Sequence, residues 1–265
     1  MGLERLLEET PEAYYWMGFL FADGYFSEKV GGTCVIIALS EKDKNHLEKL
    51  SKLVDVPLKQ THSTWDHRGV KKISAQYRLE KWDKDNVLKI IKKFSILPLK
   101  TYNPPTDLNI ENVDFFISFL VGFIDGDGCI DKQGCLHVQC HKSWNSLLEQ
   151  WFNRLYKISD AVILNRVQKT SLKCSIDKRD GSGRIEIYNN DILIFLKNKI
   201  AELKLPILER KWNRVVQRKR YKRNSSELKA SIRNMIEAGL TQKEIGHNVG
   251  VDPSYVAFIK GGEKR

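Results

Sequence analysis

The spacing of apolar residues follows the same series of patterns twice along the chain. The order is an apolar run ending in Asp-Gly, a hairpin-like β-prone segment, an amphipathic helix, a second β-prone pair and a further helix. In the first half these segments lie at 16–24, 33–39, 47–54, 60–65 with 73–79, and from 85; in the second half they lie at 120–128, 135–140, 147–155, 161–167 with 184–188, and from 190. The pattern predicts an α+β fold made of two αββαββα units.

The two apolar runs share more than their hydrophobicity. They read WMGFLFADG and LVGFIDGDG, and their aspartates, Asp23 and Asp127, are 104 residues apart. Each run has small residues four positions apart, so these residues lie on one helical face and let two backbones approach closely. We therefore predict that the two helices pack side by side and bring Asp23 and Asp127 together at their C-terminal ends.

The boundaries of these units follow from composition. Two consecutive prolines within 103–107 cannot continue a helix, so this stretch predicts a stiff linker between a first half, 1–105, and a second half, 106–213. Six of the ten residues in 214–223 are basic, and we predict a basic linker over 214–226 followed by a separate domain over 227–265.

The last segment has the pattern of three short helices. Thr241 and Glu244 have the spacing of a capping box, Gly250 marks a turn, and Pro253 fits the first position of a third helix. This order is similar to a helix-turn-helix DNA-binding domain, whose third helix would offer Ser254, Tyr255 and Lys260 to the major groove. A small helical bundle that contacts another protein is the alternative.

The net charge of the chain indicates which kind of partner it binds. The chain carries 44 Lys and Arg against 33 Asp and Glu, a formal net charge of +11, and residues 213–265 hold +7 of it. This favours nucleic acid as partner, with phosphate contacts from Arg218, Lys219, Arg220, Lys222 and Arg223, although such a run is also typical of a solvated helix face. The longest apolar stretch, 115–124, is too short to span a membrane.

Five cysteines form no CxxC pair, and the N-terminus has no secretory pattern. We therefore expect a reduced, intracellular setting, in a bacterial or phage-infected cytoplasm or an organelle, rather than secretion. Cys135, His137, Cys140 and His141 cluster in the sequence, but they alternate as in a strand and have no paired second knuckle, so we do not expect a structural zinc site there.

The paired runs resemble the LAGLIDADG motif of homing endonucleases, over about residues 10–215. The resemblance implies a pseudo-twofold core with two saddle-shaped antiparallel sheets, acting as a monomer that cuts both strands of a DNA duplex. Phe21 departs from the motif where an aspartate is often found, and Trp16 is bulky for the first position.

The resemblance also implies roles for individual residues. Asp23 and Asp127 would be catalytic and would bind two or more divalent ions, Mg²⁺ with Mn²⁺ or Ca²⁺ as substitutes, together with the carbonyls of Ala22 and Gly126. Physical reasoning agrees, because a cation removes the repulsion between two close carboxylates. A basic residue would assist in each half: Lys100 in the first, and Lys211 in the second, where Arg210 stays open as an alternative.

Outward residues of the sheets would read base edges in the major groove of double-stranded DNA. The candidates are Gln60, His62, Lys71, Lys72, Gln76 and Arg78 in the first half, and His137, Gln139, His141, Arg166, Gln168, Lys173 and Arg184 in the second. Two other functions fit the same scaffold: a DNA-binding transcriptional regulator that does not cleave, and a maturase that assists intron RNA folding.

Overall fold

The computed structural model describes residues 2–29, 32–67, 70–106, 108–131, 134–163, 173–176, 182–187, 190–216 and 226–261. The chain forms two compact units, Met1–Val215 and Val216–Arg265. The first unit contains both copies of the repeated pattern, and the second contains three helices.

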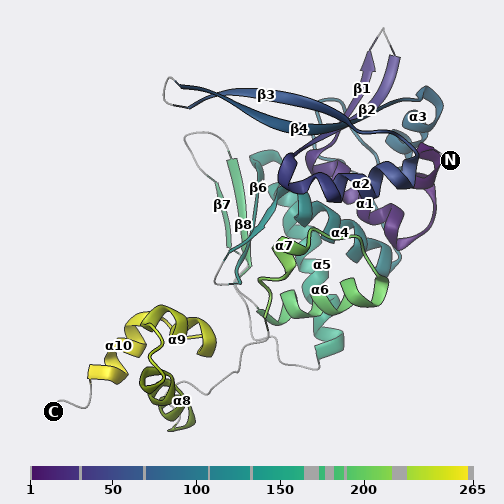
Figure 1. Cartoon of the computed structure of the whole chain (residues 1–265). Coiled ribbons are helices and arrows are strands. Elements are labelled where there is room, and N and C mark those ends of the chain that lie inside the picture. Colours follow the sequence, from purple (N-terminus) through teal and green to yellow (C-terminus); the bar gives the residue numbers. More distant parts are fainter. Residues whose placement is uncertain are drawn as a thin grey trace. The chain divides into compact units, whose positions relative to one another are not determined.

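The two halves of the first unit have the same order of elements (Figure 1). The first half consists of α1 (Pro11–Asp23), β1 (Tyr25–Lys29), β2 (Gly32–Ser40), α2 (Lys44–Val54), β3 (Lys59–His67), β4 (Val70–Trp82) and α3 (Lys84–Lys93). The second consists of α4 (Val113–Asp127), β5 (Gly128–Ile130), β6 (Leu136–His141), α5 (Asn145–Ile163), β7 (Lys173–Ile176), β8 (Ser182–Ile187) and α6 (Asn190–Leu203), followed by the short α7 (Glu209–Trp212). The predicted duplicated αββαββα fold is confirmed.

Each half builds one antiparallel sheet with the same topology. The strand orders are β1-β2-β4-β3 and β5-β6-β8-β7. Along β6, buried Leu136 and Val138 alternate with more exposed His137 and Gln139. One face of each sheet therefore packs against the helices, and the other is left for solvent or a ligand.

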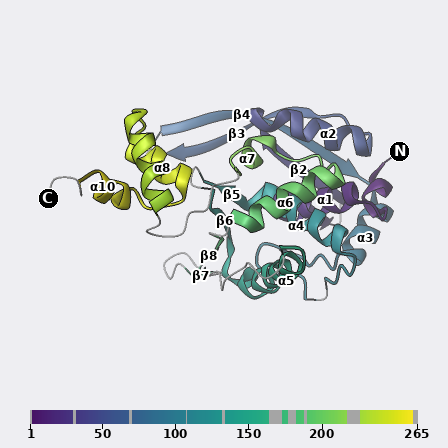
Figure 2. The ribbon, with the colours of Figure 1, turned by 90° about the horizontal axis from the view of Figure 1, so that it is seen from below.

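Helices α1 and α4 form the most extensive helix–helix contact of the chain and lie side by side in both ribbon views (Figures 1 and 2). Their glycines make this contact possible. A Cβ on Gly18 would lie 1.8 Å from the carbonyl oxygen of Phe119, and a Cβ on Gly122 would lie 1.9 Å from that of Tyr15. Any larger residue at either position would push the two helices apart.

Both motif helices also have a defined start. The Thr10 side chain accepts a hydrogen bond from the backbone N–H of Ala13, and Pro11 occupies the first helical position. Asn112 does the same for α4, accepting from the N–H groups of Asp114 and Phe115. These N-caps satisfy donors that have no partner inside the helix.

The strand predicted at 161–167 is wrong over 161–163, and 164–167 lie outside the described residues. Residues 161–163 belong to α5, which runs to Ile163, and the strand that pairs with β8 is β7 at Lys173–Ile176. No glycine or proline occurs between Asn145 and Ile163 to stop the helix, so it continues past the expected boundary.

The C-terminal unit has its own small core. It consists of α8 (Ser226–Glu237), α9 (Gln242–Val249) and α10 (Pro253–Gly261). Leu228, Ile232, Ile245, Val249, Val256 and Ile259 pack together in its interior. The capping box of Thr241 and Glu244 is present, and Gly250 ends α9 in the left-handed conformation, as the sequence predicts. Over the described parts of the chain, no helix has the length and apolarity that a membrane span requires.

Candidate active site

The two motif aspartates end neighbouring helices at one place. Asp23 is the last residue of α1, and Asp127 is the last residue of α4. A Cβ built on Gly126 would lie 2.2 Å from the Cβ of Ala22 and 3.5 Å from the Cγ of Asp23. Asp23 is exposed and Asp127 is half-buried, so both carboxylates reach the surface, and the charge of Asp23 acts on Asp127.

The surroundings of this pair oppose ionisation. Loss of solvent, followed by repulsion from Asp23, raises the pKa of Asp127 to about 6. Loss of solvent also raises the pKa of Asp23, although Lys211 and Lys100 oppose the shift. Like charges that share a partly dehydrated site disfavour each other's charged form, and a bound cation would relieve this cost.

The two predicted lysines both lie at this place. The Nζ of Lys100 donates to the carbonyl oxygens of Phe21 at 2.5 Å and Ala22 at 3.0 Å, at the end of α1. Each lysine thus holds the negative end of one motif helix, and burial lowers the pKa of both ammonium groups.

Lys211 makes the equivalent contacts in the second half and is almost fully buried. Its Nζ donates to carbonyl oxygens around the end of α4, namely Ile124 at 3.2 Å, Gly126 at 3.2 Å, Gly128 at 2.6 Å and also Asp125. Arg210, which the sequence left open as an alternative, points elsewhere: it forms a two-pronged ion pair with Asp43, with N···O distances of 2.7 and 2.8 Å. Lys211 is therefore the basic residue at the second helix end.

The carbonyls that were predicted as metal ligands already have partners. Those of Ala22 and Gly126 accept hydrogen bonds from Lys100 and Lys211. A carbonyl oxygen has two lone pairs, so each can still offer one to a cation. With the two carboxylates they form a set of hard oxygen donors, which fits Mg²⁺ or a similar divalent ion.

A buried polar network behind the site was not predicted from the sequence. Asp125 is 1% exposed, and its carboxylate accepts from the Tyr15 hydroxyl at 2.7 Å, the Leu208 N–H at 2.9 Å and the Trp212 indole N–H at 2.8 Å. His46 Nε2 lies 3.0 Å from the same Tyr15 hydroxyl. The one available signal was the mismatch between the motifs, since Asp125 corresponds to Phe21.

Burial in this network also shifts the pKa values of its ionisable groups. Burial raises the pKa of Asp125, against the effect of its three donors. Burial also lowers the pKa of His46 to about 3, so this ring is neutral. The hydrogen bonds of Asp125 fix the segment 208–212, and this segment carries Lys211.

Strand register decides which base-reading candidates share a face. In the second sheet, His137 pairs with Glu186 and Gln139 pairs with Arg184, and all four lie on the outward face. His141 follows at the end of β6, where its Nδ1 lies 2.9 Å from the Ser143 hydroxyl. The predicted residues His137, Gln139 and Arg184 thus share one surface.

In the first sheet, the strand register divides the candidates between two faces. Gln76 and Arg78 pair with Ser40 and Ala38 and face outward. Gln60 pairs with Tyr77, and His62 pairs with Ala75, which places both on the face opposite to Gln76 and Arg78. Both are exposed there, so their role in reading bases stays a prediction. Side chains alternate along a strand, and the sequence did not give the register of β3 against β4.

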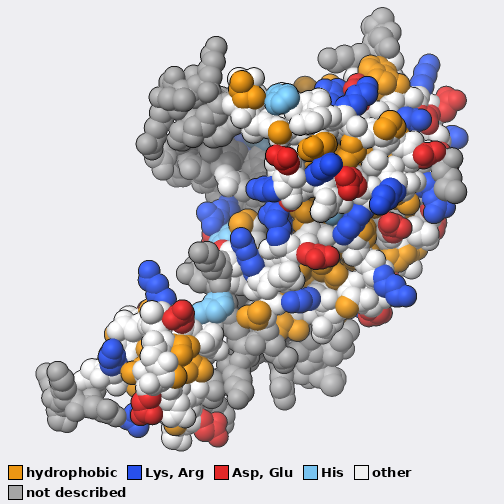
Figure 3. All heavy atoms as spheres, in the orientation of Figure 1, with side chains coloured by type: hydrophobic (Ala, Val, Ile, Leu, Met, Phe, Trp, Pro, Cys, Tyr) orange, Lys and Arg blue, Asp and Glu red, His pale blue; other side chains and the backbone are white. Residues whose placement is uncertain are grey.

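Most of the other candidates lie wholly or partly outside the described residues. Lys71, Lys72 and Lys173 lie in strands, but their side chains are outside the described part. Seven further candidates lie entirely outside it: Arg166, Gln168, Arg218, Lys219, Arg220, Lys222 and Arg223. Ser254, Tyr255 and Lys260 lie on α10, and Ser254 and Lys260 are exposed. In Figure 3, Lys and Arg side chains are spread over the visible face of the first unit, and several of them lie near β6 and β8.

Comparison with solved structures finds proteins of similar architecture. A point mutant of the homing endonuclease I-SmaMI aligns with 97% of this chain and 99% of its own, at a TM-score of 0.50 and 13% sequence identity. The homing endonuclease I-WcaI, bound to its DNA recognition sequence, aligns with 82% of this chain and 88% of its own, at a TM-score of 0.48 and 17% identity. The LAGLIDADG homing endonuclease I-SmaMI bound to cleaved DNA aligns with 96% and 97% of the two chains, at a TM-score of 0.45 and 14% identity.

No family model matches the sequence, and no curated protein does. The fold is that of the LAGLIDADG homing endonucleases, of the type in which one chain contains both halves. At this low identity the likeness concerns the fold alone.

Proposed function

We propose that this chain is a site-specific, metal-dependent DNA endonuclease that hydrolyses one phosphodiester on each strand of a duplex. The observation that carries the proposal is the convergence of Asp23 and Asp127 at the ends of two helices in glycine-mediated contact. A duplicated core that served only to bind DNA would have no use for two carboxylates whose ionisation is opposed by their surroundings.

The donor set indicates what the site would hold. Asp23 and Asp127 would bind divalent cations, with the carbonyls of Ala22 and Gly126 as further oxygen ligands. Mg²⁺ suits such hard oxygen donors, and Mn²⁺ or Ca²⁺ would substitute in binding. Bound there, the cations would supply an activated water and stabilisation of the charge on the departing oxygen.

The other residues would position this chemistry. Lys100 and Lys211 hold the two helix ends and place positive charge beside the carboxylates, where it would attract the phosphate backbone. Because both halves are in one chain, a monomer would contain the complete pair of sites. Since the halves differ in sequence, the target would be asymmetric.

DNA recognition would come from two parts of the chain. The outward faces of the sheets offer Gln76, Arg78, Gln139 and Arg184 to base edges and phosphates. The helices α9 and α10 would act as a helix-turn-helix, with Ser254, Tyr255 and Lys260 on the second of these helices. A linked second module raises the overall affinity because its binding becomes intramolecular.

Selection of cleaved sites from a random duplex pool in the presence of Mg²⁺ tests the proposal. We expect one recovered site that is cut on both strands. Asp23→Asn and Asp127→Asn should each abolish double-strand cutting and keep binding, whereas Asp85→Asn, a change of an exposed acid on α3, should leave cutting intact.

Other outcomes would indicate the alternatives. Metal-independent binding of a duplex with no cleavage of any site would point to a transcriptional regulator. Tight binding to a structured intron RNA with weak binding to duplex DNA would point to a maturase. Full cutting activity in either aspartate variant would reject the assigned site.

A further inference from the structure

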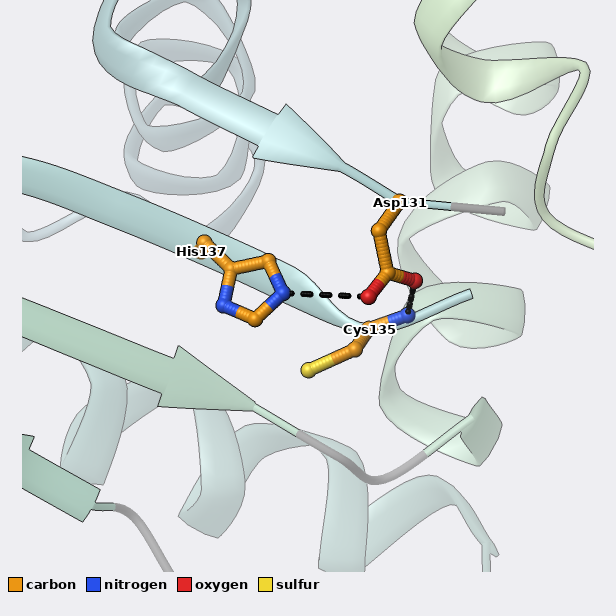
Figure 4. Close-up of side chains that lie close together, drawn as sticks. All are labelled: Asp131, Cys135 and His137. Atoms are coloured by element: carbon orange, nitrogen blue, oxygen red, sulfur yellow. Dashed lines mark hydrogen bonds and ion pairs between the residues drawn. The ribbon is translucent and has the colours of Figure 1, made fainter. Parts of the chain in front are cut away.

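A second group of potential metal ligands lies away from the paired aspartates, at the turn between β5 and β6. Asp131 directly follows β5, Cys135 directly precedes β6, and His137 is the second residue of β6. One ligand atom from each residue lies within 4.8 Å of the other two. Figure 4 shows the Asp131 carboxylate between the His137 ring and the backbone nitrogen of Cys135.

Strand geometry explains why these three residues meet. Cys135 and His137 are two positions apart and so point to the same side of the strand. The turn returns Asp131 to them: its Oδ1 accepts from the Cys135 N–H at 2.9 Å, and its Oδ2 lies 3.1 Å from His137 Nε2. This set differs from the sequence cluster of Cys135, His137, Cys140 and His141, because Cys140 alternates to the core side, where it packs against apolar residues.

The distances are compatible with one cation. In a tetrahedral zinc site with metal–ligand bonds of about 2.0–2.3 Å, ligand atoms are about 3.3–3.8 Å apart. The Asp131 oxygen and His137 Nε2 are already 3.1 Å apart. The Cys135 sulfur lies within 4.8 Å of both atoms, so it would move by roughly 1 Å to bind the same ion. One sulfur, one nitrogen and one oxygen donor form a set that suits Zn²⁺ better than Mg²⁺.

The surroundings of His137 resemble those of a metal-bound histidine. Its Nε2 faces Asp131, and its other nitrogen, Nδ1, lies 3.2 Å from the Glu186 carboxylate and 2.8 Å from the Arg184 guanidinium, which donates to it. Metal binding through Nε2 would therefore require Nδ1 to take up the proton and Arg184 to move away from it. Histidines that bind zinc through one nitrogen commonly donate the other N–H to a carboxylate, which fixes the ring and the tautomer. Glu186 is held in turn by Arg184 at 2.7 Å.

We infer that Asp131, Cys135 and His137 form a Zn²⁺ site, with water as the fourth ligand and Glu186 as the residue that orients His137. The Cys135 thiol would release its proton to solvent when its sulfur binds the metal. The thiol now donates to the Ile187 carbonyl at 3.3 Å, and burial raises its pKa to about 12, so the metal has to displace that proton. The bound ion would fasten the end of β5 to β6 and tie His137 to the turn.

Cobalt substitution in the full-length chain tests this inference without an activity measurement. A thiolate bound to Co²⁺ gives a charge-transfer absorption in the near ultraviolet, whereas the oxygen donors around Asp23 and Asp127 give none. We expect this band to saturate at one equivalent of Co²⁺ per chain, and Zn²⁺ to abolish it by displacing Co²⁺.

Matched variants locate the site. Cys135→Ser and His137→Gln should lose the band, and Cys140→Ser should keep it, since Cys140 is a neighbouring thiol on the same strand. Glu186→Gln should keep the band with about tenfold weaker metal affinity, because it removes only the orienting carboxylate. Because His137 is only half-buried, His137→Gln still tests the site if the Cys135 variant fails to fold. Circular dichroism checks the fold of each variant.

Three results would overturn the inference: no band in the wild-type chain, a band that persists in Cys135→Ser, or a band that disappears in Cys140→Ser. The outcome is independent of cleavage. A chain that lacks the zinc site can still cut DNA through Asp23 and Asp127, and a chain that does not cut can still bind zinc at the turn.

Discussion

Removing the charge of Asp127 should stabilise the metal-free protein while it abolishes the proposed activity. The pKa of Asp127 is about 6 in the folded chain, against 3.8 for an ordinary aspartate. A difference of about two pH units at about 1.4 kcal/mol each corresponds to about 3 kcal/mol at neutral pH. Because Asp127 is only half-buried, screening by water reduces the expected gain to about 1–2 kcal/mol.

The sign follows from proton binding. A carboxyl group whose pKa is raised by folding binds its proton more tightly in the folded state, so through this group the wild-type protein loses stability as the pH rises from 3.8 to about 6. The Asp127→Asn chain lacks this loss. Its advantage should therefore be complete above pH 6 and absent below pH 3.8.

Urea denaturation in the presence of a chelator, at pH 7 and at pH 3.5, measures this difference. A second arm adds Mg²⁺, which should stabilise the wild-type chain by about 2.7 kcal/mol at a hundred times the dissociation constant and leave Asp127→Asn nearly unchanged. An Asp127→Asn chain that is less stable than wild type at pH 7 without metal would refute the electrostatic reasoning, because it would mean that the charge contributes favourably to the empty site.

The remaining predictions concern the framework around the aspartates. Gly122→Ala should lower the free energy of unfolding by about 3 kcal/mol in urea denaturation, whereas Gly261→Ala, whose Cβ meets no atom within 4 Å, should change it little; equal effects would contradict the helix contact. Lys100→Met and Lys211→Met should each slow the cutting of one strand roughly 100-fold, so that nicked plasmid accumulates, and unchanged formation of linear plasmid would rule out that role. Asp125→Asn should lower the free energy of unfolding by about 2 kcal/mol, because an amide cannot accept from all three of its donors, and a variant of unchanged stability would show that the network is dispensable.

The sequence predicts the fold well because the same pattern occurs twice, and each copy supports the interpretation of the other. The helical run before Asp23 and the run before Asp127 are each ambiguous alone, but the spacing of four between Gly18 and Ala22, and between Gly122 and Gly126, predicts the close contact that the structure contains. Local rules were sufficient wherever the determining residues are adjacent, as in the capping box at Thr241.

The sequence does not predict strand register, because register depends on the alignment of distant segments. Nothing near Gln60 or His62 specifies which residue of β4 each one faces, and a change of one residue in register moves a side chain to the other face. The choice between Arg210 and Lys211 was open for a related reason. It depends on Asp43, which is 167 residues from Arg210 and forms an ion pair with it.

The two lysine-bearing segments are each held in part by residues of the opposite half. The Trp144 indole of the second half donates to the carbonyls of Lys100 and Thr101 at 3.1 Å, and so holds the first lysine. Tyr15 of the first half donates to Asp125, which fixes the segment that carries Lys211. The crossing contacts differ in chemistry because Phe21 replaces the buried carboxylate in the first half. Phe21 packs edge-on against Phe119 and Trp144 of the second half, so apolar packing performs at one helix end what a hydrogen-bonded aspartate performs at the other.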